Sequence, residues 1–71
     1  MKNNLRFLNQ DQYNELINLY HLARTALADK PFSEQGKYYR MLWATKEFNK
    51  KYPSISATAA YKDLEVNLAG Y

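Results

Sequence analysis

The stretch that decides the fold is EFNKKYPSISATAAYKDL, residues 47–64. A basic segment ends at a short turn that holds Pro53 and Ile55, and a serine then precedes an alanine-rich segment. Proline disfavours the α conformation in the residue before it, and serine is a strong N-cap residue. One helix should therefore end near Lys51 and the next should begin near Ala57. Because alanines let two helices approach closely where they cross, this pattern predicts a helix–turn–helix corner.

Residues 50–68, KKYPSISATAAYKDLEVNL, also resemble the helix–turn–helix segment of winged-helix DNA-binding regulators of the ferric-uptake-regulator type. In that family a sequence motif leads into the recognition helix. The motif consists of an aromatic residue and a proline, followed in order by an aliphatic residue, a serine, a tyrosine and a leucine. The matching residues here are Tyr52, Pro53, Ile55, Ser56, Tyr61 and Leu64. The resemblance implies that the helix after the turn faces the DNA groove.

Working outward from the corner, apolar periodicity indicates three helices, at about residues 11–28, 34–51 and 57–68. Few residues are β-branched and no two-residue hairpin signal occurs, which argues against a sheet. The expected N-caps are Asn9 or Asp11, Ser33, and Ser54 or Ser56. We therefore expect an all-α fold, a single small three-helix domain over residues 1–71.

The inner stripes of these helices give the expected core: Leu16, Tyr20, Leu27, Met41, Phe48, Tyr61 and Leu64. Tyr38 and Thr45 share the core face of the second helix, and Leu42 lies at its margin. A chain of 71 residues buries only about 60% of its unfolded surface, and without cysteine it has no disulfide. Because the first helix is apolar over more than half its circumference, we expect a homodimer.

The positive charge is concentrated in residues 37–52, which hold five basic residues and one acidic residue, whereas the rest of the chain is net −1. Such a field favours an anionic partner. The leading hypothesis is a small non-enzymatic nucleic-acid-binding regulator, of the size found among phage and plasmid accessory proteins, that binds double-stranded DNA. The expected contact residues are Lys46, Lys50, Lys51, Thr58, Ala59 and Lys62.

The outer face of the second helix supports an alternative hypothesis. Tyr39, Arg40 and Trp43 combine aromatic rings with a guanidinium, and protein interfaces are rich in these residue types. They would make the chain a helical interaction module or a small inhibitor of an acidic protein. The competing interpretation is structural, because the apolar N-terminal residues could cover Trp43. Those residues are Leu5, Phe7 and Leu8.

Catalysis finds little support in the sequence. His21 is the single histidine and lies off the apolar arc of its helix, and no glycine-rich phosphate loop is present. Asp63 and Glu65 stand two residues apart and so point to different faces of a helix. We expect no enzyme activity, no cofactor and no metal. No apolar run approaches the length of a membrane span, and the start lacks a signal-peptide pattern, so we expect a cytoplasmic protein.

Overall fold

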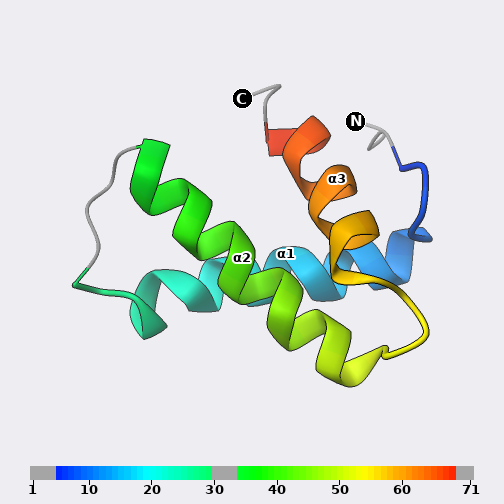
Figure 1. Ribbon diagram of the computed structural model, residues 1–71, viewed down its shortest axis with the longest axis horizontal. Helices are drawn as coiled ribbons and strands as arrows, with labels where there is room; N and C mark the ends of the chain where they lie inside the picture. Colours follow the sequence, from blue (N-terminus) through cyan, green and yellow to red (C-terminus); the bar gives the residue numbers. More distant parts are fainter. Residues whose placement is uncertain (1–4, 30–33, 69–71) are drawn as a thin grey trace.

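The computed structural model describes residues 5–29 and 34–68. Within these ranges the chain forms three helices and no strand: α1 (Gln10–Ala26), α2 (Glu34–Lys51) and α3 (Ala57–Leu68). In Figure 1, α2 crosses α1, and α3 turns back from the end of α2, so that every helix packs against the other two. The predicted all-α, three-helix fold is confirmed.

Side chains of the expected types cap α1 and α3. The Asn9 carboxamide accepts the Gln12 backbone N–H at 2.8 Å, and the Gln12 side chain accepts the Asn9 N–H at 3.0 Å. This reciprocal capping box satisfies two backbone donors at the start of α1. The Ser56 hydroxyl accepts the Ala59 N–H at 3.1 Å and caps α3. The cap predicted at Ser33 lies outside the described residues.

The helix boundaries agree with the prediction for α2 and α3 and differ for α1. α1 ends at Ala26, two residues before the expected position, because Leu27 leaves the helical conformation with φ −117° and ψ 44°. The Leu27 N–H still donates to the Ala23 carbonyl at 2.8 Å. As a C-cap residue, Leu27 is only half-buried and lies outside the core, so its placement in the core was wrong.

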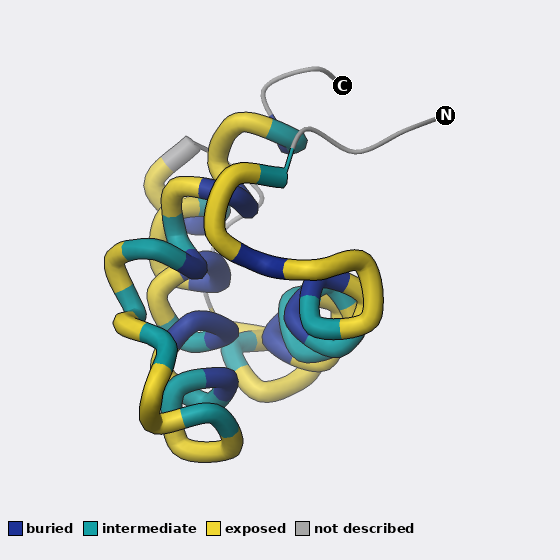
Figure 2. The backbone as a smooth tube through the Cα atoms, turned by 90° about the vertical axis from the view of Figure 1, so that its right-hand side faces the viewer, coloured by how far each residue is buried: buried dark blue, intermediate teal, exposed yellow. Residues whose placement is uncertain are grey.

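The core lies where the three helices meet, and Figure 2 shows the buried stretches on their inward sides. Four of the expected core residues are buried, and Tyr20 and Tyr61 are half-buried against them. The buried cluster consists of Leu8, Tyr13, Leu16, Met41, Ala44, Phe48, Ala60, Leu64 and Leu68. Residues from every helix, and from the segment before α1, thus share one core.

Most of the wide apolar arc of α1 is covered inside a single chain. Ile17, Leu19 and Tyr20 all pack against the core cluster, whereas Leu22 is 58% exposed. The arc is wide because α1 contacts both other helices, as a central helix in so small a bundle must. The homodimer stays a prediction.

The corner between α2 and α3 is held by local hydrogen bonds across residues 52–56. The Ile55 N–H donates to the Tyr52 carbonyl at 3.0 Å, and the Asn49 side-chain amide donates to the Ile55 carbonyl. The Ile55 side chain packs against the core, and the Phe48 and Tyr52 rings lie 4.8 Å apart. These contacts set the direction in which α3 leaves the turn.

A buried carboxylate fastens the segment before α1 to α3. Asp63 is 1% exposed, and its Oδ1 atom accepts the Arg6 N–H at 3.0 Å. Its Oδ2 atom accepts the N–H groups of Phe7 at 3.0 Å and Leu8 at 2.8 Å. Figure 1 shows this segment beside α3. The three bonds hold the Leu8 side chain in the core, a role that the sequence analysis did not assign to Asp63.

We predict that Asp63→Ala destabilises the fold strongly, whereas Glu65→Ala on the exposed side of the same helix does not. Hydrogen bonds to a charged group each contribute about 1.5–3 kcal/mol, so losing all three should cost about 3 kcal/mol or more. Exposed substitutions usually change the free energy of unfolding by about 0.5 kcal/mol or less. Urea denaturation of the two variants measures the difference. Equal midpoints would show that the Asp63 bonds contribute nothing.

Candidate interaction groove

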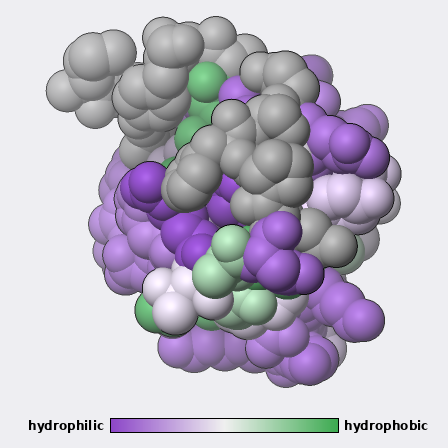
Figure 3. Space-filling model, turned by 90° about the vertical axis from the view of Figure 1, so that its left-hand side faces the viewer, coloured by the Kyte–Doolittle hydropathy of each residue, from purple (hydrophilic) through white to green (hydrophobic). Residues whose placement is uncertain are grey.

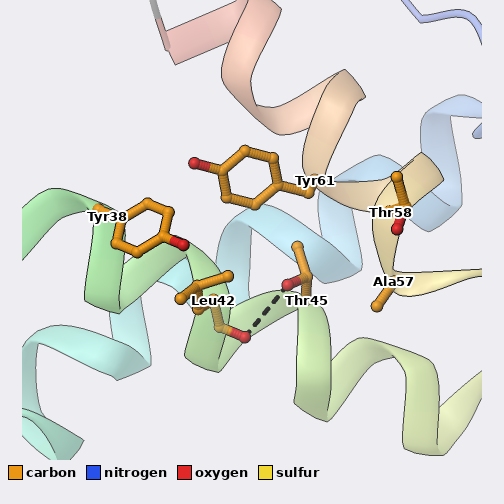
Figure 4. A pocket seen from close by; sticks show the side chains of 6 residues that line it. All are labelled: Tyr38, Leu42, Thr45, Ala57, Thr58 and Tyr61. Atoms are coloured by element: carbon orange, nitrogen blue, oxygen red, sulfur yellow. Dashed lines mark hydrogen bonds between the residues drawn. The ribbon is translucent and has the colours of Figure 1, made fainter.

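An open groove of about 280 Å³ lies between α2 and α3. Its lining residues are Tyr38, Leu42 and Thr45 from α2, and Ala57, Thr58 and Tyr61 from α3 (Figure 4). On α2 the lining positions are four and then three residues apart, so their side chains form one stripe. The α3 positions belong to its first turns, next to the corner. The groove is therefore a direct product of the way the corner sets the two helices against each other.

The groove exposes apolar surface because α2 and α3 diverge away from the corner, as Figure 1 shows. Near the corner Thr45 is buried, whereas Leu42 is 40% exposed and Tyr38, nearer the start of α2, is 49% exposed. Tyr38 was expected on the core face of the second helix, but its side chain is not buried. Helical periodicity put it on the core face correctly, but α3 has moved away from α2 at that level.

One hydroxyl of the groove is already hydrogen-bonded, and two of its aromatic rings contact each other. The Thr45 hydroxyl donates to the Leu42 carbonyl at 3.1 Å, so it is already bonded within α2 (Figure 4). The Tyr38 and Tyr61 rings lie 6.2 Å apart and 75° from parallel, the edge-to-face arrangement that aromatic quadrupoles favour. The interior of the groove thus offers ring carbons and methyl groups to a ligand.

The environment of the groove raises the pKa of the Tyr61 phenol. Burial is the main cause, because desolvation disfavours the phenolate, and the nearby Glu65 carboxylate and Tyr38 add to it. At neutral pH the hydroxyl is protonated and can donate a hydrogen bond. The Tyr61 hydroxyl is therefore a hydrogen-bond donor at the α3 wall of the groove.

Two of the expected phosphate-binding lysines pair with carboxylates of the chain itself. Lys50 Nζ lies 2.9 Å from Glu47 Oε2, and Lys51 Nζ lies 2.9 Å from Glu15 Oε2. The bond to Glu15 is the main reason why the pKa of Lys51 is raised. An anionic ligand would have to compete with these carboxylates, although both lysines are solvent-exposed. Their proposed role in nucleic-acid binding stays a prediction.

Lys46 and Lys62 differ from that pair. Both are exposed, and neither forms an ion pair with another residue of the described ranges. Lys46 stands four residues after Leu42 and Lys62 four residues after Thr58, so each continues a stripe that lines the groove. Each of these lysines therefore stands one helical turn after a groove-lining residue, Lys46 on α2 and Lys62 on α3.

The other expected nucleic-acid contacts lie at the start of α3. Thr58 is exposed and lines the groove, whereas Ala59 is half-buried and donates its N–H to Ser56. Of the expected nucleic-acid contacts, Thr58 thus lies on the groove itself, one helical turn before Lys62. Tyr38, Leu42 and Thr45 were not among the site residues expected from the sequence. Only the four-then-three spacing of this stripe could have singled them out.

The expected partner-binding residues on α2 do not share one exposed surface. Tyr39 is exposed, Trp43 is half-buried against the core cluster, and Arg40 is only 7% exposed. Of the N-terminal residues that could cover Trp43, Leu8 enters the core and Phe7 is exposed. Figure 3 shows one face of the molecule on which hydrophilic residues predominate and hydrophobic ones form small areas between them.

Other kinds of site receive no support from the described ranges. They contain no group of three or more histidine, cysteine, aspartate or glutamate residues placed to hold a metal ion. His21 is exposed on α1. Among α1, α2 and α3, none has the length and apolar character needed to cross a membrane. The groove remains the feature with the clearest binding geometry.

No protein-family model, no curated protein and no solved structure matches this chain. The resemblance of residues 50–68 to winged-helix regulators therefore stays a prediction.

We predict that Tyr61 titrates above the ordinary tyrosine pKa of 10.0. The folded state favours the protonated phenol, so this contribution to stability is present below pH 10 and is lost as the pH rises through the raised value. Glu65→Gln should lower the midpoint by removing one of the causes, whereas Asp11→Asn on α1 should not. Ring-proton NMR shifts during a pH titration measure both. An unchanged midpoint in Glu65→Gln would contradict the assignment.

Proposed function

We propose that the protein is a non-enzymatic protein-interaction module that binds its partner in the groove between α2 and α3. The observation that carries the proposal is the apolar surface left exposed there by Tyr38 and Leu42. Covering apolar surface is favourable by about 25 cal/mol per Å². Tyrosine is also among the residues that most often dominate binding at protein interfaces.

The size of the groove favours a macromolecular partner over a small molecule. Pockets that enclose drug-sized ligands measure about 300–1,000 Å³ and cover most of the ligand. This groove is about 280 Å³ and open to solvent. It suits one or two side chains that project from a larger partner.

We predict that Leu42→Glu weakens partner binding strongly and that Leu22→Glu does not. The two leucines are a matched pair, since both are exposed on helices but only Leu42 lines the groove. A displayed random-peptide library is selected on the immobilised protein, and each selected peptide is then titrated against both variants. We expect the peptides to bind Leu22→Glu as well as the unaltered chain and to lose at least about tenfold in affinity for Leu42→Glu.

A charge placed on an exposed side chain should leave folding unchanged, which circular dichroism verifies for both variants. Peptides that bind Leu42→Glu as tightly as the unaltered protein would show that the groove is not the binding site.

Nucleic-acid binding is the second candidate, and the unpaired Lys46 and Lys62 favour it. Lys62 stands one helical turn after Thr58, near the capped start of α3, where a helix–turn–helix protein meets DNA. The two free cations would neutralise about two phosphates, which gives a log–log salt slope of about −1.8. If Lys50 and Lys51 also leave their carboxylates, the slope becomes about −3.6.

We predict that any duplex-DNA affinity is lost in the double variant Lys46→Glu with Lys62→Glu. Charge reversal repels phosphate at both positions, and neither lysine has an ion-pair partner in the described chain whose loss could disturb folding. Electrophoretic shifts over a range of salt concentrations test this. The absence of a shift with the unaltered protein, or an unchanged shift with the double variant, removes this candidate.

A further inference from the structure

The groove between α2 and α3 brings two tyrosine rings close to a carboxylate. Tyr38 and Tyr61 line the groove, and Glu65 stands one helical turn after Tyr61. We infer that the groove receives an arginine side chain of a partner protein, with the guanidinium against the tyrosine rings and beside Glu65. The inference rests on the proposed function of the groove and names the side chain that the partner supplies.

The aromatic rings are arranged so that a cation can approach them. Tyr38 and Tyr61 come from different helices and meet across the groove (Figure 4). Their ring centres lie 6.2 Å apart at 75°, so the rings do not cover each other as parallel rings would. Tyr38 is 49% exposed, and the ring of Tyr39 lies 6.0 Å from it at 58°. The face of an aromatic ring is negative and attracts a cation, more often arginine than lysine.

The carboxylate beside the rings adds a full negative charge. Glu65 is exposed, and it forms no ion pair within residues 5–29 and 34–68. It acts on the Tyr61 hydroxyl, whose pKa is raised first by burial and then by this carboxylate. Lys62 follows Tyr61 directly, but adjacent residues on a helix do not face each other. The charge at the Tyr61 wall of the groove is therefore negative and favours a cation.

The lining of the groove favours arginine over lysine. The groove measures about 280 Å³ and is open, and Leu42 and Thr58 offer apolar surface to the methylene stem of an arginine. Because the guanidinium is planar, it can stack on a ring and present a fork of N–H donors to a carboxylate. The lysine ammonium is compact and more strongly hydrated, so it gains less from such a site.

Neither a phosphate group nor a second copy of this chain fits the groove as well. A phosphate would meet the Glu65 carboxylate with like charge, which opposes binding. A second copy could offer Arg6 or Arg24, which are both exposed. Each chain carries a net charge of +3, however, and like net charges oppose self-association. We therefore assign the arginine to a different protein.

The test compares short alanine peptides with blocked ends that carry one central arginine, lysine or citrulline. Citrulline is the matched control, because it keeps the shape of arginine without the charge. Binding is followed by ¹H–¹⁵N NMR shifts of the amides of Leu42, Tyr61 and Glu65. We expect the arginine peptide to bind about two- to fivefold more tightly than the citrulline peptide, with the lysine peptide between them.

Variants of the protein then locate the bound cation. Glu65→Gln should lower the affinity for the arginine peptide about two- to fivefold and leave that for the citrulline peptide unchanged, whereas Asp11→Asn on α1 should change neither. Comparing both peptides on both proteins isolates the interaction between Glu65 and the guanidinium. Tyr38→Leu keeps the groove apolar and should cost the arginine peptide a similar factor. Unchanged arginine affinity in Glu65→Gln would overturn the inference.

Leu42→Asn and Leu22→Asn separate failure of the inference from failure of the proposed function, because they remove apolar surface without changing the charge. If the arginine and citrulline peptides bind equally, and only Leu42→Asn weakens both, the arginine is wrong and the function stands. If they bind equally and Leu42→Asn has no effect, both are overturned. If no peptide binds, or if the amides shift with protein concentration alone, as a second copy would cause, the inference is overturned and the library selection decides the function separately.

Discussion

The structure depends on one carboxylate. Asp63 is almost completely buried, and burial of a charge is costly unless hydrogen bonds replace its water. The three backbone donors of Arg6, Phe7 and Leu8 supply that replacement, and they lie just before the start of α1. The negative charge therefore also lies near the positive end of the α1 dipole. One side chain thereby joins the beginning of the chain to its last helix and completes the core with Leu8.

Residues 6–8 lie on the Asp63 side of α3, and the groove lies on another side of the same helix. Tyr61, two residues before Asp63, points to the side of α2 and meets Tyr38 there. One face of this twelve-residue helix therefore holds the segment before α1, and another face lines the groove. Its position is fixed on one side by hydrogen bonds and on the other by the corner, which keeps the groove open without needing tight packing against the start of α2.

Local signals were enough to predict the secondary structure. Pro53 and Ser56 act within a few residues of themselves, so the end of α2 and the start of α3 could be placed from the sequence, and the burial of Phe48 followed from helical periodicity. The predicted burial of Leu27 was wrong because helical periodicity does not show at which residue a helix ends. The exposure of Tyr38, which shares the core face of α2, could not be predicted because it depends on the divergence of two helices.

The candidate site was harder to predict, since charge is visible in a sequence but its neutralisation is not. Lys51 pairs with Glu15, which is 36 positions away along the chain and is brought close only by the packing of α2 on α1. Asp63 looked like an ordinary acidic residue on a helix, because its partners are backbone groups more than fifty positions away. Counting charges therefore overstated the field of residues 37–52 and gave no sign of the buried carboxylate.

The bonds to Asp63 have a consequence for how this sequence can drift during evolution. The carboxylate accepts hydrogen bonds from main-chain N–H groups and so hardly constrains the side chains of Arg6 and Phe7, which are both exposed. Those two positions are free to change to nearly any residue except proline, which has no N–H. Position 63 has no comparable freedom, and position 8 must stay apolar. Relatives of this chain would then share an aspartate opposite a variable stretch, a pairing that covariation between side chains could not reveal.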